Sequence, residues 1–93
     1  MLIECRCGQW TLRGRSIGGF GTAILIKELG VTLDVGFFLP EILRGDHLFL
    51  SHGHPDHIGA LVSWLGARRL LGMNTANIFA PVGLAAGLVD VLA

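Results

Sequence analysis

Residues 51–57 read Ser-His-Gly-His-Pro-Asp-His, and this stretch is the most informative part of the sequence. It contains three imidazoles and one carboxylate, those of His52, His54, Asp56 and His57. Imidazole nitrogens and carboxylate oxygens are ligands for zinc, iron and manganese in proteins. Neighbouring imidazolium groups would repel one another, which favours neutral, metal-binding side chains over a solvated or pH-sensing loop. The stretch therefore predicts a metal site.

The spacing of the donors fits the end of a strand followed by the start of a helix. Residues two apart on a strand share a face, so His52 and His54 can bind one metal together. Asp56 and His57 then open the helix and face a second metal. Two metals can hold a shared water, lower its pKa and stabilise the attacking and leaving oxygens of a hydrolytic displacement. The expected chemistry is hydrolysis.

Two titratable residues outside the cluster need separate interpretations. His47 lies five residues before His52 and is interpreted as a solvated histidine. Asp34 lies near the end of the apolar segment Val31–Val35, where a charged residue needs a reason. One reason is a hydrogen bond to the far nitrogen of a metal-bound imidazole. The other is a turn aspartate beside Gly36. The local sequence leaves both open.

Composition sets limits on the class of protein. The chain has 93 residues, 52% of them hydrophobic and 15% charged, with seven acidic and seven basic side chains. The zero net charge gives no overall attraction to a polyanion, and Arg68 and Arg69 are interpreted as a solvated helix end. Cys5 and Cys7 are expected to be free thiols. No apolar run is long enough for a membrane span and no secretory signal is seen, so we expect a cytoplasmic protein.

Hydrophobic periodicity and turn residues predict an α/β fold in one folding unit, residues 1–93. The glycine-rich segment Gly14–Gly21 lacks the context of a nucleotide-binding loop and is expected to connect two strands. The expected strands are Leu2–Leu12 with a turn at Gly8, Thr22–Leu29, Val31–Val35, His47–Ser51 and Asn77–Ala80. The expected helical segments are a turn at Pro40–Leu43, an amphipathic helix from Ile58 to Leu71 ended by Gly72, and Gly83–Leu92. Trp64 is expected in a core or an interface.

Two segments carry a resemblance to a known family. His52-Gly-His54-Pro-Asp56-His57 and Leu33-Asp34-Val35-Gly36 resemble the signature segments of metallo-β-lactamase-fold hydrolases. Within that superfamily the chain is most similar to the amino-terminal half of short ribonuclease Z, the transfer-RNA 3′-processing endonuclease. The similarity extends over nearly the whole chain, including Gly14–Gly18, Ile58–Leu61, Arg69–Met73 and Ile78–Pro81. It implies a partial αββα sandwich, with one sheet and two covering helices.

The resemblance also implies a role for each donor. His52 and His54 would bind one zinc, and Asp56 and His57 another, with other divalent metals as substitutes. Asp56 would also orient or deprotonate the attacking water, and Asp34 would be the supporting carboxylate. In the complete family the substrate is precursor transfer RNA, which is cut just beyond the discriminator nucleotide to leave a 3′-hydroxyl.

The chain departs from the family pattern after the histidine cluster. No histidine follows His57, whereas the family requires further His and Asp ligands and a second αβ half. We therefore expect little or no activity from this polypeptide alone. Either it is a truncated product, or it pairs with a chain that supplies the other half, as a homodimer or with a complementing chain. Two alternatives stay open. One is another hydrolase of this fold that acts on a small ester, thioester or phosphodiester. The other is a non-catalytic remnant that acts through an exposed apolar face.

Overall fold

The first third of the chain consists of short strands separated by turns, and it folds into an antiparallel meander. In the computed structural model, which describes residues 2–92, the four strands pair in sequence order. They are β1 (Ile3–Cys7), β2 (Trp10–Ile17), β3 (Gly21–Ile26) and β4 (Val31–Leu33). Gly8 and Gly30 have φ angles of 59° and 62° in two of the turns, a region that glycine adopts without steric cost. These turns fall where the sequence predicts them.

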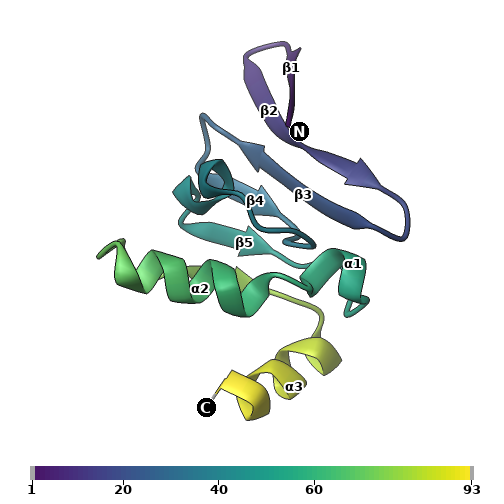
Figure 1. Ribbon diagram of the computed structural model, residues 1–93, viewed down its shortest axis with the longest axis vertical. Coiled ribbons are helices and arrows are strands. Elements are labelled where there is room, and N and C mark those ends of the chain that lie inside the picture. Colours follow the sequence, from purple (N-terminus) through teal and green to yellow (C-terminus); the bar gives the residue numbers. More distant parts are fainter. Residues whose placement is uncertain (1, 93) are drawn as a thin grey trace.

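The remaining strands are added in parallel, through crossover connections. The helical segment η1 (Pro40–Arg44) precedes β5 (His47–Phe49), and α1 (Pro55–Ile58) and α2 (Leu61–Leu70) precede β6 (Asn77–Phe79). The helix α3 (Val82–Leu92) follows. β5 pairs in parallel with β4 and with β6, so the sheet has the order β1-β2-β3-β4-β5-β6 (Figure 1). The α/β class is confirmed, and this mixed sheet with its helices matches part of a metallo-β-lactamase-type sandwich.

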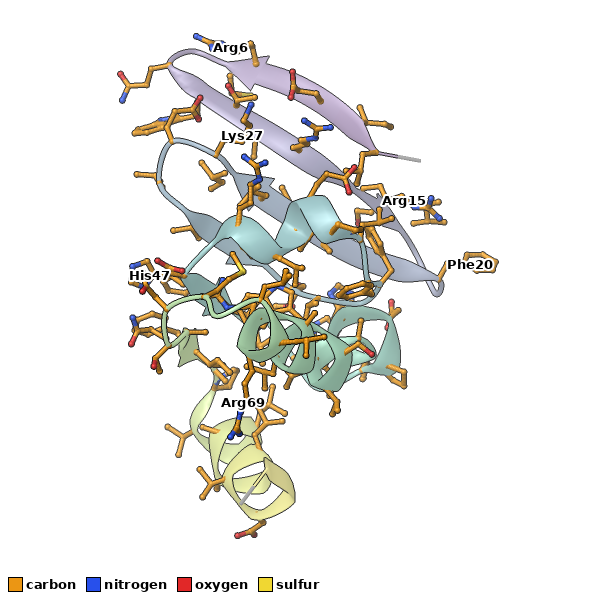
Figure 2. The ribbon with its side chains drawn as sticks, turned by 60° about the vertical axis from the view of Figure 1, so that its left-hand side comes forward. Arg6, Arg15, Phe20, Lys27, His47 and Arg69 are labelled. Atoms are coloured by element: carbon orange, nitrogen blue, oxygen red, sulfur yellow. The ribbon has the colours of Figure 1, made fainter. Side chains whose placement is uncertain are left out.

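Two predicted boundaries are wrong. The connection expected at Gly14–Gly21 is much shorter, because β2 continues to Ile17 and pairs with β3 as far as Gly21. Phe20 lies at the tip of this hairpin and projects away from the body of the protein, with 80% of its surface exposed (Figure 2). The strand continues because its residues find hydrogen-bonding partners in β3, which its glycine content does not reveal.

The helix expected from Ile58 to Leu71 is interrupted after Ile58 and resumes at Leu61. The interruption lets the amide of Ala60 donate to the carbonyl of Val35 at 2.9 Å. It also sets the buried face of α2. Leu61 and Trp64 are buried, whereas Val62, expected on the apolar stripe, is 68% exposed.

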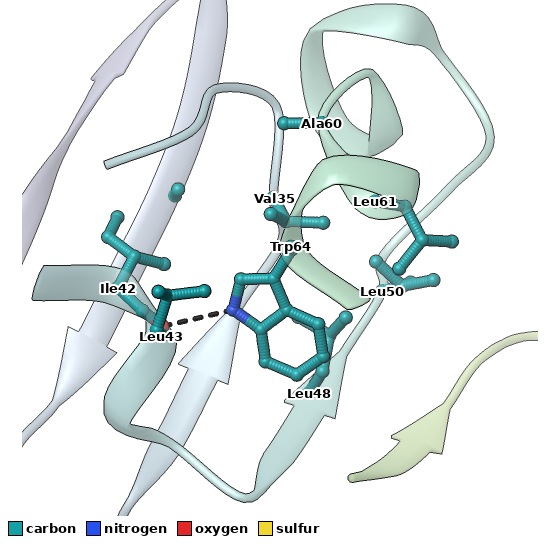
Figure 3. Close-up of a cluster of buried hydrophobic side chains, with 9 residues drawn as sticks. Val35, Ile42, Leu43, Leu48, Leu50, Ala60, Leu61 and Trp64 are labelled. Atoms are coloured by element: carbon teal, nitrogen blue, oxygen red, sulfur yellow. Dashed lines mark hydrogen bonds between the residues drawn. The ribbon is translucent and has the colours of Figure 1, made fainter. Parts of the chain in front are cut away.

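The core lies between the sheet and the segments η1 and α2. Trp64 is fully buried, and its indole nitrogen donates to the carbonyl of Ile42 at 3.0 Å (Figure 3). This bond satisfies the polar atom of a large apolar side chain, which confirms Trp64 as a core residue. Val35 and Leu48 pack in the same cluster. Val35 immediately follows Asp34, so the core fixes the backbone that carries this carboxylate.

Arg68 is a buried structural residue, and its prediction as a solvated helix end is wrong. Only 3% of its surface is exposed. Its guanidinium donates to the carbonyls of Leu43, Gly45 and Asn74 at 2.6–2.8 Å and pairs with Asp46 at 2.7 Å. The planar guanidinium can serve several carbonyls at once, which explains why a charged residue is tolerated inside. Arg69, its neighbour, is exposed as expected.

The other face of the sheet carries a continuous apolar row across all six strands. The strand register places these residues side by side: Ile3, Gly14, Ile24, Leu33, Phe49 and Phe79. Phe49 and Phe79 stack at 4.5 Å between ring centroids and remain 42% and 47% exposed. η1 and α2 lie on the opposite face (Figure 1). We call this row the outer sheet face.

Two smaller expectations concern the thiols and the membrane. Cys5 and Cys7 are free and exposed, as predicted. Among residues 2–92, no helix has the length and apolar character needed to cross a bilayer.

Candidate metal centre

The predicted donors lie where β5 gives way to α1. Pro55 occupies the first turn of α1, where its fixed φ suits a helix start and its missing amide costs no hydrogen bond. The carbonyl of His54 accepts from the amides of His57 and Ile58 at 2.9 and 3.1 Å. This tight turn brings Asp56 and His57 back towards the end of the strand.

The three imidazoles of the stretch gather at this junction. The His52 ring lies between the other two, with its centroid 4.6 Å from that of His54 and 4.0 Å from that of His57. The Asp56 carboxylate reaches the same group, with its Oδ2 3.4 Å from Nε2 of His57. The structure therefore brings all four predicted donors together.

Asp34 lies directly behind His57. Its residue is buried, with 6% exposure, and it has a φ of 60°, the only positive value of a non-glycine residue in the described chain. Its carboxylate accepts from the amide and the hydroxyl of Ser51, both at 2.7 Å, and Oδ2 lies 2.8 Å from Nδ1 of His57. Burial alone would raise the pKa of Asp34, but the hydrogen bonds from Ser51 and His57 together hold this pKa below its ordinary value.

The backbone after Asp34 attaches α1 to the sheet. The amide of Val35 donates to the carbonyl of His57 at 2.8 Å, and the carbonyl of Val35 accepts from Ala60 at 2.9 Å. At Gly36, a β-carbon would collide with the carbonyl of Asp56. Residues 34–36 thus hold the donor turn by a carboxylate, by two backbone hydrogen bonds and by a close approach that only glycine permits.

Two residues outside the predicted set also contact the donors. Ser51 joins Asp34 to His52, because its Oγ lies 2.9 Å from Nδ1 of His52. Gly19, in the β2–β3 turn, donates its amide to Oδ2 of Asp56 at 3.3 Å. Ser51 adjoins His52 in sequence, and this adjacency could have identified Ser51 as a member of the cluster. Gly19 lies 37 residues from Asp56, and no local pattern indicates this contact.

His47 lies apart from the donor cluster. Its Nδ1 is 3.3 Å from the side-chain amide of Asn77, and its ring is 6.3 Å from that of Phe79. It is the first residue of β5, at the end of the strand opposite to the donors (Figure 2). It provides a natural control for experiments on the cluster.

The donors are suited in chemistry to a divalent metal, but the described chain does not arrange them as a complete site. Within residues 2–92, no group of three or more His, Cys, Asp and Glu side chains is placed to hold a metal ion. The observed donor pair of Asp56 and His57 supplies one oxygen and one nitrogen. Stable zinc sites in proteins usually have three or four protein ligands. The donors among residues 2–92 therefore do not by themselves provide the ligands of a stable zinc site.

Comparison with known proteins gives the class of this chain. No family model matches it. It is 35% identical over 75 residues to tRNase Z TRZ1 of Arabidopsis thaliana, and 32% identical over 73 residues to the chloroplastic tRNase Z TRZ2 of the same plant. It is also 35% identical over 72 residues to the nuclear ribonuclease Z of Triticum aestivum. These alignments include 81%, 78% and 77% of this chain.

The sheet, the donor junction and these relatives together identify a ribonuclease Z-like chain with the metallo-β-lactamase fold. The resemblance stated from the two sequence segments is confirmed. The chain spans 27%, 21% and 41% of the lengths of the three relatives. Most of each relative therefore lies outside the region of similarity.

Proposed function

We propose that this chain contributes part of the two-metal centre of a zinc-dependent endonuclease of the ribonuclease Z type, which processes the 3′ ends of transfer RNA. One observation carries the proposal. The β5–α1 junction gathers His52, His54, Asp56 and His57 in a chain similar to three proteins named tRNase Z or ribonuclease Z.

In this proposal His52 and His54 bind one metal, and Asp56 and His57 bind the other. Two ligands of one tetrahedral zinc, each about 2.1 Å from the ion, lie about 3.4 Å apart. Oδ2 of Asp56 and Nε2 of His57 are separated by 3.4 Å, which supports their assignment to a common ion. When bound, such ions lower the pKa of a shared water and stabilise negative charge on phosphodiester oxygens.

Asp56 has a second role in the proposal. Its carboxylate lies at the donor cluster with 20% of the side chain exposed, so water can reach it. The amide of Gly19 donates to Oδ2 and restricts the rotation of the carboxylate. We assign to Asp56 the orientation of the attacking water and the acceptance of its proton.

The proposal includes a partner, because the donors among residues 2–92 do not form a complete metal site and one apolar face of the sheet is uncovered. An apolar sheet face is stable when a second layer covers it, and the outer sheet face displays Phe49 and Phe79 to solvent. The relatives contain far more chain than the matched region. We propose that a complementing ribonuclease Z-like polypeptide packs a second sheet on this face and supplies the missing ligands. By itself, the present chain has little or no activity in this scheme.

Calorimetric zinc titration tests the ligand assignment. His52→Ala and Asp56→Ala each remove one donor, so each should weaken zinc binding by at least about tenfold relative to the unchanged chain. His47→Ala serves as the matched control, because it removes an imidazole outside the cluster and should leave binding unchanged. Equal zinc uptake by all four proteins would refute the metal centre.

Cleavage assays test the substrate. The chain combined with a complementing polypeptide should cut a 3′-extended precursor transfer RNA and leave a 3′-hydroxyl, and Asp56→Ala should abolish the cut. Turnover of small phosphodiesters, esters or thioesters without cleavage of the RNA would overturn the substrate and favour the alternative hydrolase. Absence of both activities, together with self-association, would favour a non-catalytic remnant.

Cytoplasmic location is part of the proposal and is supported by the two free, exposed thiols. One relative is named nuclear and another chloroplastic, so location differs among similar proteins. Fluorescence microscopy of the tagged protein in its own cells checks it, and signal confined to another compartment would contradict it.

A further inference from the structure

We propose that Ser51 is a positioning residue, which acts with Asp34 to fix His52 and His57 in one tautomer, with the proton on Nδ1 and the lone pair on Nε2. Asp34 acts on His57 directly and on His52 through the Ser51 hydroxyl. One part of this inference rests on the proposed function, namely that the two Nε2 atoms bind the metal ions. The proton positions themselves follow from hydrogen bonds within this chain.

The hydrogen bonds at Asp34 determine the tautomer of His57. An ionised carboxylate has no proton to donate, so each close polar neighbour must donate to it. Nδ1 of His57 lies 2.8 Å from Oδ2 of Asp34, and it therefore carries a proton. In a neutral imidazole the other nitrogen is then the acceptor, which leaves the lone pair on Nε2.

The same reasoning extends through Ser51 to His52. Oγ of Ser51 lies 2.7 Å from Oδ2 of Asp34, so the single hydroxyl proton points to the carboxylate. Towards His52 the hydroxyl oxygen is then an acceptor. Nδ1 of His52 lies 2.9 Å from that oxygen and must be the donor. Its lone pair is left on Nε2, as in His57.

The opposite arrangement is disfavoured by electrostatics. If the Ser51 hydroxyl donated to His52, two oxygens 2.7 Å apart at Asp34 would have no proton between them. The two oxygens would repel each other without a bridging proton, which makes the reversed tautomer a minor population. The amide of Ser51 also donates to Oδ1 of Asp34 at 2.7 Å. The backbone therefore anchors the chain of hydrogen bonds that runs from Asp34 through Ser51 to His52, which we call the relay.

His54 provides an internal reference. Within residues 2–92, no hydrogen bond to its ring nitrogens is formed, and its residue is exposed. Its tautomer is therefore set by water and not by the protein. The structure thus predicts two fixed imidazoles and one free imidazole in the same stretch.

Long-range ¹H–¹⁵N correlation spectroscopy of metal-free, histidine-labelled protein measures these tautomers. The spectra are recorded at a pH of about 8, above the pKa of about 6.5 of a free imidazole. We expect Nδ1–H for His52 and His57, and a tautomer mixture for His54. In Ser51→Ala, His52 should change to a mixture like that of His54, while His57 stays unchanged. Ser51→Thr, which keeps a hydroxyl, should restore the signal of His52.

Two results would overturn the relay: a proton on Nε2 of His52 in the unchanged protein, or a His52 tautomer that is insensitive to Ser51→Ala. Circular dichroism verifies that the variant keeps its fold, since a lost fold would change His57 as well. Zinc titration separates the relay from the proposed function. Ser51→Ala should weaken zinc binding about 10- to 100-fold. If zinc binds neither protein while the spectra agree with the prediction, the metal centre fails and the relay stands.

Discussion

The backbone of Gly36 lies directly against the carbonyl of Asp56, so closely that a β-carbon at position 36 would overlap the carbonyl oxygen. This contact joins the loop after β4 to the first turn of α1, which carries two of the proposed metal ligands. It shows that the donor turn is held by the sheet and not by its own local structure. A helix of four residues could not hold this geometry alone.

Replacement of Gly36 tests this contact. Gly36→Ala should lower the free energy of unfolding by about 1–3 kcal/mol, because the methyl group must displace backbone. Zinc binding should weaken in parallel. Gly66→Ala is the matched control: no atom lies within 4 Å of its added carbon, and alanine in an exposed helix stabilises by about 0.5–1 kcal/mol. Chemical denaturation measures both, and equal stabilities would contradict the predicted clash.

Arg68 should be far more sensitive than its neighbour in sequence. Arg68→Ala leaves the carbonyls of Leu43 and Gly45, both in buried hydrogen bonds, without this donor, and each unpaired buried acceptor costs about 1–3 kcal/mol. We expect a variant that is largely unfolded or has lost at least about 3 kcal/mol. Arg69→Ala, on the exposed side, should change stability by no more than about 0.5 kcal/mol. Thermal unfolding of the two variants would show the difference, and similar melting temperatures would refute the structural role.

Low pH should weaken the hydrogen bonds between Thr11 in β2 and Glu28 in the turn after β3. The Glu28 carboxylate accepts from the hydroxyl and the amide of Thr11, both at 2.6 Å, and these bonds lower its pKa from 4.5 to about 2. A pKa depressed by folding gives stability that is present above the unfolded value and lost as the pH falls from 4.5 towards 2. Melting temperatures at pH values between about 5 and 2 should therefore fall more steeply for the unchanged chain than for Glu28→Gln. Glu41→Gln is the control, and it should follow the unchanged chain.

The outer sheet face should control association. Phe79→Asp places a charge in the stacked pair with Phe49, so it should reduce self-association and binding of a complementing chain. Val62→Asp is the control, because Val62 is 68% exposed on α2, away from that face. Analytical ultracentrifugation measures the masses. A Phe79→Asp variant that associates as strongly as the control would show that another surface is used.

Local signals predicted most of the fold. The turns at Gly8 and Gly30, the helical turn after Leu39 and the strand at β5 depend on residues adjacent in sequence, and the structure has each of them. The break between α1 and α2 was not predicted. It exists because Ala60 bonds to Val35, a partner 25 positions earlier, and periodicity within a helix contains no information about such a partner.

The same distinction applies to the candidate site, where local sequence predicted some features and distant partners set the others. His52, His54, Asp56 and His57 were named from their spacing, because ligands within one short stretch must lie near one another. The environments of Asp34 and Arg68 were not decided by spacing. Local sequence left Asp34 between two interpretations, and it favoured the wrong one for Arg68. Asp34 contacts Ser51 and His57, and Arg68 contacts Leu43, Gly45 and Asp46, all of them more than ten positions away. Only the bond from Arg68 to Asn74 is local.

The donor types, the strand-to-helix junction that carries them and the similarity to ribonuclease Z can all be read from the order of the amino acids. The folded arrangement was needed to show which atoms face the donors, that Ser51 and Gly19 join the cluster, and that one sheet face is apolar and uncovered. The two groups of features differ in the distance along the chain over which the interactions act. Backbone propensity and side-chain spacing act over a few residues, whereas burial and hydrogen-bond pairing depend on segments that meet only when the sheet has formed.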